Sequence, residues 1–103
     1  KAEFLKPLLQ NSLEVVKAKY RPKSQILEIQ LKNITSSDLL FENEMEYTFY
    51  DSSPVFEIPA GETKQLLVKT LETKTEILLK LKALGCFTAP RQQPIIDWKI
   101  SVN

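Results

Sequence analysis

The clearest pattern in the chain is an alternation of hydrophobic and polar residues in several separate segments. Near the C-terminus, Ile96, Trp98 and Ile100 alternate with charged neighbours. The same period of two runs through residues 27–31 and 45–49. Because successive side chains of a β-strand point to opposite faces, this alternation predicts strands with one buried and one exposed face.

The turn-forming residues between these segments divide the chain into seven or eight predicted strands. The strands are expected at 4–9, 13–20, 25–33, 39–50, 55–58, 64–71, 76–84 and 95–102. Pro7 should confine the first strand to a sheet edge, and the fourth is expected to be broken or bulged near 42–44. The turn signal is strong at 59–62, where Pro59 leads and Gly61 is free to take a positive φ. Short strands separated in this way are typical of an antiparallel sandwich or barrel.

Two segments also allow a helical interpretation. Segment 76–84 follows Thr75, a good helix N-cap, and precedes Gly85, a good helix terminator. As a strand, the same segment points Ile77, Leu79, Leu81 and Ala83 inward. We favour the strand and expect it to form a hairpin with 64–71 through the polar residues between them. Segment 12–20 carries the same ambiguity, and its two valines favour β-structure.

The inward positions of the predicted strands define an expected hydrophobic core. Its members share the buried side of the alternation, and they are Val16, Leu27, Ile29, Leu31, Met45, Tyr47, Phe49, Leu66, Val68, Ile77, Leu79, Leu81, Ile96, Trp98 and Ile100.

Composition predicts a single domain with only a weak net electrostatic field. The chain has 103 residues, of which 43% are hydrophobic and 26% are charged, and its formal net charge is +1. This charge gives no strong attraction to nucleic acid or to an anionic membrane, and no apolar run approaches a bilayer-spanning length. The chain opens on Lys1 without a signal peptide, so residues 1–103 are expected to be a single domain excised from a larger chain.

The residue types that carry most catalytic chemistry are scarce. The chain has no histidine and one cysteine, Cys86, in the apolar sequence Leu84-Gly85-Cys86-Phe87. Because no base or cation is positioned to activate this thiol, we expect a buried, inert side chain. General acid–base catalysis, nucleophilic relays and transition-metal sites lean on histidine and cysteine. The sequence therefore predicts no enzyme and no catalytic, cofactor-binding or metal-binding residues.

Two groups of carboxylates could instead indicate a functional site. Glu42, Glu44 and Glu46 have a spacing of two, which would place them on one strand face as a possible hard-cation site. A solvated strand face that resists edge pairing is the preferred interpretation, with Lys80 or Lys82 facing Glu44 or Glu46 across strands. Asp97 and Glu57 leave glycosidase chemistry open, although no substrate cleft is indicated around them.

A few residues are candidates for contact with a partner. Trp98 is expected in the core, with an aromatic platform for a sugar ring as the alternative. Tyr50 falls on the opposite parity from Tyr47 and Phe49 and is the best aromatic candidate for an exposed contact. Arg91, Gln92 and Gln93 lie in a predicted loop over 86–94 and are candidates for polar contacts to a neighbouring domain.

Two segments resemble known modules. Ile29-Gln30-Leu31-Lys32-Asn33-Ile34-Thr35, and the step from Phe56-Glu57-Ile58-Pro59-Ala60-Gly61-Glu62 into the following strand, resemble immunoglobulin-like β-sandwich domains of the accessory type. Such modules are appended to secreted bacterial polysaccharide-degrading enzymes, and similar sandwiches occur in ciliary and centrosomal proteins. The two cysteines that bracket a tryptophan in antibody domains are absent, and the resemblance assigns no functional residues.

Together these observations predict an all-β fold, an antiparallel two-sheet sandwich of seven or eight strands with Greek-key connections. The expected role is a non-catalytic accessory or interaction module that packs against or spaces a neighbouring domain or protein partner. The alternative is a carbohydrate-binding module that holds a polysaccharide through Tyr50 or Trp98. No cofactor, nucleic-acid or membrane partner is expected. The compartment stays open, with a secreted or periplasmic location slightly favoured over a cytoplasmic one.

Overall fold

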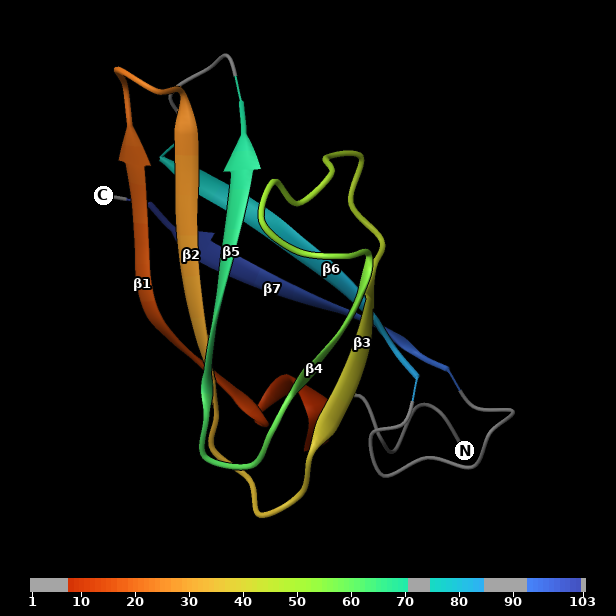
Figure 1. The fold of residues 1–103 in the computed structure, drawn as a ribbon. Coiled ribbons are helices and arrows are strands. Elements are labelled where there is room, and N and C mark those ends of the chain that lie inside the picture. Colours follow the sequence, from red (N-terminus) through yellow and green to blue (C-terminus); the bar gives the residue numbers. More distant parts are fainter. Residues whose placement is uncertain (1–7, 71–74, 85–92, 103) are drawn as a thin grey trace.

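The computed structural model describes residues 8–70, 75–84 and 93–102, and the fold is built from seven strands (Figure 1). In chain order these are β1 (Leu13–Arg21), β2 (Ile26–Asn33), β3 (Leu39–Asn43), β4 (Val55–Ile58), β5 (Thr63–Lys69), β6 (Glu76–Ala83) and β7 (Ile95–Ser101). Among the described residues, no helix has the length and apolar character needed to cross a membrane.

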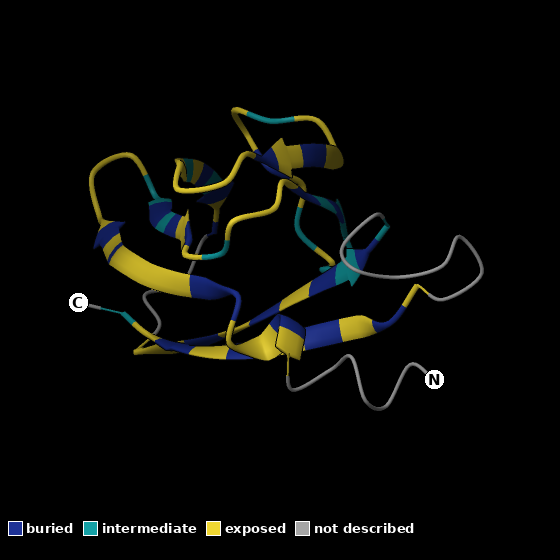
Figure 2. Ribbon diagram, turned by 90° about the horizontal axis from the view of Figure 1, so that it is seen from below, coloured by how far each residue is buried: buried dark blue, intermediate teal, exposed yellow. Residues whose placement is uncertain are grey.

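The strands form two antiparallel sheets packed face to face. One sheet has three strands in the order β1-β2-β5, and the other has four in the order β4-β3-β6-β7. In Figure 1, β6 and β7 cross obliquely behind the three-stranded sheet. Buried and exposed residues alternate along the strands of both sheets (Figure 2), because each sheet has one face in the core and one in solvent. The predicted all-β, two-sheet sandwich is confirmed.

Segment 76–84 is a strand, as predicted, but the expected hairpin is wrong. β6 pairs with β3 on one side and with β7 on the other, and it places Leu79 opposite Trp98. β5 lies in the other sheet, where it pairs with β2 and makes a single bridge from Val68 to Phe49. Since both edges of β6 are already paired within its own sheet, the chain crosses from one sheet to the other between β5 and β6.

The core prediction holds at most positions and fails at Val16. Twelve of the fifteen predicted residues are buried, while Met45 and Tyr47 are partly buried and pack against the core. Val16 is 52% exposed. Val15 pairs with Leu31 and Lys17 with Gln30, so the residue between them is an unpaired β-bulge on the edge strand. The bulge shifts the alternation of β1, and Ala18 and Tyr20 point inward beyond it.

Two predicted strands differ in extent from the expectation. The strand expected at 39–50 breaks at Asn43, within the predicted break at 42–44, and the chain then turns before Phe49 returns to the edge of β5. The expected strand at 4–9 falls partly outside the described residues. Residues 8–10 are helical, and the Ser12 hydroxyl donates a hydrogen bond to the Leu9 carbonyl at 2.6 Å.

The turn at 59–62 forms as predicted and connects the two sheets. Gly61 takes a φ of 76°, a conformation that glycine adopts without a side-chain clash. The Gly61 amide donates to the Asn33 carbonyl, and the Asn33 amide donates to the Glu62 carbonyl, both at 2.9 Å. The two segments that resemble Ig-like modules therefore lie against each other.

Candidate interaction surface

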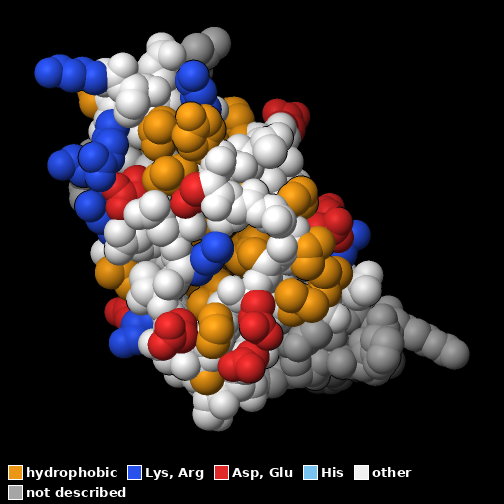
Figure 3. Space-filling view, in the orientation of Figure 1, with side chains coloured by type: hydrophobic (Ala, Val, Ile, Leu, Met, Phe, Trp, Pro, Cys, Tyr) orange, Lys and Arg blue, Asp and Glu red, His pale blue; other side chains and the backbone are white. Residues whose placement is uncertain are grey.

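The outward face of the three-stranded sheet carries the best candidate surface, which we call the β1–β2–β5 face. Its residues alternate with the core residues along each strand, and the register aligns Lys19, Glu28 and Leu67 in one row across the sheet. Figure 3 looks onto this face. Hydrophobic side chains gather over the upper part of β2 and β5, and basic side chains follow the β1 edge.

Tyr50 is held beside this face by hydrogen bonds to β5. The Tyr50 amide donates to the Leu67 carbonyl at 2.6 Å, and the Leu67 amide donates to Asp51 Oδ1 at 2.9 Å. Gln65 Nε2 donates to Asp51 Oδ2 at 3.3 Å. The Asp51 carboxylate therefore accepts the hydrogen bond that a carbonyl of a neighbouring strand would otherwise accept. Tyr50, in the same anchored segment, is 69% exposed.

Glu28 lies at the centre of the same face in a network of cations and amides. Its carboxylate accepts hydrogen bonds from Arg21 Nη2 at 2.6 Å and from Gln30 Nε2 at 2.7 Å, and Lys17 Nζ lies 3.6 Å away. Its side chain is only 5% exposed. The hydrogen bonds from Arg21 and Gln30 hold the pKa of the Glu28 carboxyl below its ordinary value, against the opposing effect of burial.

A hollow of about 300 Å³ lies between this network and β5. It is lined by Arg21, Ser24, Ile26, Glu28, Gln65 and Leu67. Ile26 and Leu67 are half-buried although they point away from the core. The surface thus combines an apolar floor, hydrogen-bonding side chains at its border and one exposed tyrosine.

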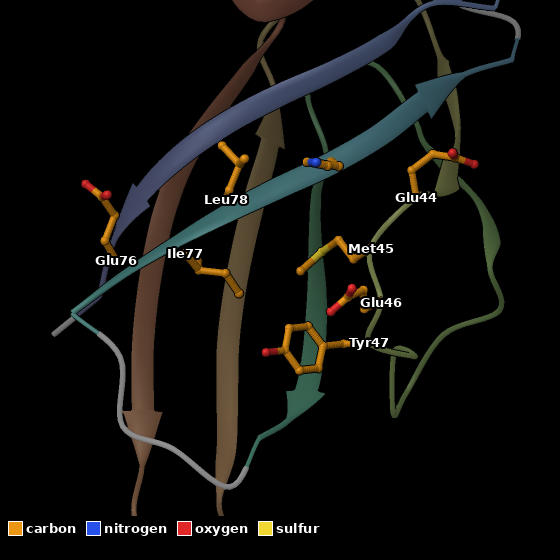
Figure 4. Close-up of a pocket in the computed structure, with 8 residues that line it drawn as sticks. Glu44, Met45, Glu46, Tyr47, Glu76, Ile77 and Leu78 are labelled. Atoms are coloured by element: carbon orange, nitrogen blue, oxygen red, sulfur yellow. The ribbon is translucent and has the colours of Figure 1, made fainter.

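A second hollow of about 300 Å³ lies where the turn after β3 approaches β6 (Figure 4). Asn43 shapes this turn, because its Oδ1 accepts a hydrogen bond from the Met45 amide at 2.8 Å and its Nδ2 donates to the Tyr47 carbonyl at 2.7 Å. The turn places Met45, Glu46 and Tyr47 along the hollow, and β6 supplies Glu76, Ile77 and Leu78. Three carboxylates, from Glu44, Glu46 and Glu76, line it together with Lys80.

The predicted acidic strand face is not formed as expected. Only Glu42 lies in β3, since Glu44 and Glu46 follow the end of the strand. Lys82 Nζ lies 3.9 Å from Glu42 Oε1 and 3.7 Å from Glu44 Oε2, so the predicted lysine–glutamate contact across strands involves Lys82. Within the described ranges, no group of three or more His, Cys, Asp or Glu side chains could hold a metal ion.

The two carboxylates weighed for glycosidase chemistry are far apart. Glu57 lies on β4 and Asp97 on β7, which are the opposite edges of the four-stranded sheet. Three strand spacings separate them, or about 14 Å, which is beyond the separation of a glycosidase pair. Asp97 instead lies opposite Lys80 in the β6–β7 register.

The predicted contact residues differ in exposure, and some of them are not described by the structure. Tyr50 is exposed, as expected, and Gln93 is exposed at the start of the last described segment. Arg91, Gln92 and Cys86 lie outside the described residues. Trp98 is buried, as predicted, and its Nε1 donates to the Gln10 carbonyl at 2.9 Å. Its ring meets Phe41 edge to face, with a centroid distance of 6.1 Å.

Sequence reasoning missed Ile26, Glu28 and Leu67. Each occupies an outward position in an alternating strand, where the pattern predicts solvent exposure. Glu28 is covered because the register brings Lys17 and Arg21 of β1 beside it, and Ile26 and Leu67 line the hollow next to this network. No signal in the sequence fixes that register.

Comparison with known proteins identifies the type of domain. The model of a family described as an Ig-like domain matches residues 13–99. No curated protein matches the chain.

A solved structure shares the fold. It is that of a two-domain protein from Bacteroides vulgatus, which contains a predicted PHP-like metal-dependent phosphoesterase. The TM-score is 0.68 at 10% sequence identity, and the match covers 98% of this chain and 28% of the other.

Proposed function

Because the chain belongs to a family of Ig-like domains, we propose that it is a non-catalytic accessory module that packs against a neighbouring domain. The observation that carries this proposal is the β1–β2–β5 face, where Ile26 and Leu67 form an apolar floor beside exposed Tyr50. Tyrosine is enriched at interfaces, since its ring buries much area at a low cost in side-chain entropy.

The outward face of the other sheet has exposed hydrophobic residues at Val55, Leu78 and Ile95, and between them it carries charged residues of both signs. Its charged residues sit opposite one another across strands, as Glu42 does to Lys82 and Lys80 does to Asp97. The Glu42–Lys82 pair is half-buried, whereas Lys80 and Asp97 are exposed, and such exposed charges add little to an interface. Docking through β1, β2 and β5 is supported by the hollow at Ile26 and Leu67 and by Tyr50, the most exposed of the described large hydrophobic residues.

The two-domain organisation of the structurally similar protein agrees with a module that works beside another domain. This chain spans 28% of that protein, so its activity is no guide to this one. We propose the same arrangement here, in which the domain positions or stabilises a neighbour in the same polypeptide.

Carbohydrate binding is the competing proposal, and it has less support. Sugar-binding faces stack pyranose rings on exposed aromatic side chains. Among the described aromatic residues, Tyr50 is the one with a largely exposed ring, while Trp98 is buried and its indole N–H is engaged.

The proposal is tested by calorimetry of the full-length gene product. Tyr50→Ala should lower the unfolding temperature of the neighbouring domain, because it removes the docked ring. Leu78→Ala is the matched control, since Leu78 is an exposed hydrophobic residue on the opposite face. Equal unfolding profiles for wild type and Tyr50→Ala would contradict the proposal. Electrophoresis of residues 1–103 through gels containing xylan, pectin or laminarin tests the alternative, which predicts retardation that Tyr50→Ala abolishes.

A further inference from the structure

The strand positions of the β1–β2–β5 face carry a net positive charge although the whole chain is almost neutral. By the strand register, the outward positions of β1, β2 and β5 carry five basic and two acidic side chains. The basic ones are Lys17, Lys19, Arg21, Lys32 and Lys69, and the acidic ones are Glu14 and Glu28. The formal charge of these strand positions is therefore +3, and Asp51 at the edge of β5 lowers the charge of the face together with its Tyr50 segment to +2.

The buried carboxylate does not neutralise the border of the face. Glu28 is already engaged by Arg21 and Gln30, with Lys17 close by. Lys19 and Lys32 are exposed on the same face, and so is Lys69 at the top of β5. Lys69 lies opposite Ile26, and Lys19 lies in the same row as Leu67 on the far side of Glu28, so these two lysines border the apolar floor, while Lys32 lies farther along β2.

The opposite face has the other sign. The outward positions of β4, β3, β6 and β7 carry four acidic residues, Glu42, Glu57, Glu76 and Asp97, and three basic ones, Lys80, Lys82 and Lys99. Their formal sum is −1. The outward strand positions of the two sheets therefore differ by four formal charges, +3 against −1, although the net charge of the chain is only +1.

We propose that the β1–β2–β5 face docks an acidic surface of a neighbouring domain in the same polypeptide, with an apolar centre bordered by Asp and Glu side chains. This inference rests on the proposed function and adds the chemistry of the partner. An apolar centre with a complementary charged rim is the usual anatomy of a specific protein interface. A hydrated polyanion would satisfy the lysines but would leave Ile26, Leu67 and Tyr50 without apolar contact, so the face favours a protein surface.

The test is site-specific photocross-linking in the full-length gene product. A benzophenone amino acid replaces Tyr50, and the cross-linked peptides are mapped by mass spectrometry. We expect cross-links within the same polypeptide to a segment rich in Asp and Glu, at a yield that falls in 1 M NaCl because the rim charges are screened. The same amino acid in place of Leu78 is the matched control and should give few cross-links.

Charge reversal on the face then tests whether the partner surface is acidic, separately from whether the face docks at all. Lys19→Glu combined with Lys69→Glu should lower the cross-link yield on the order of fivefold, given the free energy of exposed ion pairs. Lys80→Glu combined with Lys99→Glu makes the same change on the opposite face and should leave the yield unchanged. Circular dichroism confirms that each variant keeps its β-structure.

Each other outcome overturns the inference. If Tyr50 cross-links to a neighbouring domain but charge reversal has no effect, the partner surface is not acidic, and the proposed function stands without this inference. If cross-links join two copies of the chain, the occupant is a second copy. If polygalacturonate retards residues 1–103 in a gel and the double Lys→Glu variant abolishes this, the face binds an acidic polysaccharide. If Tyr50 gives no cross-links in a folded protein, both the inference and the proposed function fail.

Discussion

Asn33 on β2 donates a hydrogen bond from Nδ2 to the backbone carbonyl of Ile58 on β4, at 2.9 Å, and so connects the two sheets. The same amide group donates to the Ser37 carbonyl at 2.7 Å, and Oδ1 accepts from the Thr35 amide at 2.9 Å. Asn33 is fully buried. A buried side chain that satisfies its hydrogen bonds in this way fixes how the sheets pack.

Asn33→Ala should destabilise the domain by about 3 kcal/mol, because it leaves the buried Ile58 carbonyl without its donor and removes two further hydrogen bonds to the loop that follows β2. Urea unfolding followed by tryptophan fluorescence measures the loss. Asn43→Ala is the control. Asn43 makes the equivalent hydrogen bonds to the residues two and four positions ahead, but it is only half-buried. Its loss should be nearer 1 kcal/mol, and equal losses would contradict a special role for Asn33.

Trp98 should be a stabilising core residue. Its emission should be blue-shifted in the native protein and should move to the red on unfolding. Trp98→Ala should cost about 3–5 kcal/mol, the usual range for emptying a large aromatic site, and Trp98→Phe should cost less because it keeps an aromatic ring against Phe41. A loss under about 1 kcal/mol for the alanine variant would show that the ring is not packed.

The bulge in β1 makes a sharp prediction about two valines. Val16→Lys should change stability by no more than about 0.5 kcal/mol, since the side chain points into solvent at an edge. Val68→Lys is the same substitution at a fully buried position of β5 and should unfold the domain. Thermal unfolding of the two variants compares them, and a large loss in Val16→Lys would mean that Val16 is buried after all.

The two valines also show what the sequence can and cannot determine. The alternation at Ile96, Trp98 and Ile100 is regular, so the buried face of β7 is predictable from local sequence alone. At Val16 the pattern is interrupted by a single inserted residue, and only the pairing with β2 reveals it. The hairpin expected between β5 and β6 failed for a related reason, since pairing partners are chosen by the whole fold.

The candidate surface was predictable only in part. Tyr50 could be identified from the sequence because it is out of step with the alternating core positions Tyr47 and Phe49. Glu28 could not, because an outward glutamate in a strand normally indicates a solvated position. Its burial depends on Arg21 and Lys17, which reach it across the β1–β2 register.

The Glu28 network should contribute to stability in a pH-dependent way. Arg21 and Gln30 lower the pKa of the Glu28 carboxyl in the folded state from its ordinary value of 4.5. The stabilisation is therefore present above about pH 4.5 and is lost as the pH falls through the lower, folded-state pKa. Between pH 7 and pH 3, the wild type should lose more stability than Glu28→Gln, as measured by urea midpoints.

The control for this experiment is Glu57→Gln, which removes an exposed carboxylate from the other sheet. It should follow the wild-type pH dependence. If Glu28→Gln also follows the wild type, the network around Glu28 does not stabilise the folded state through the charge of its carboxylate.

Lysine footprinting of the full-length gene product against isolated residues 1–103 tests docking through the β1–β2–β5 face. An acetylating reagent labels exposed lysines, and mass spectrometry reports the rate at each one. We expect Lys19, Lys32 and Lys69 to react several-fold more slowly in the full-length protein, while Lys80 and Lys99 on the opposite face keep their rates. Unchanged rates at all five lysines, or protection confined to Lys80 and Lys99, would contradict docking through the β1–β2–β5 face.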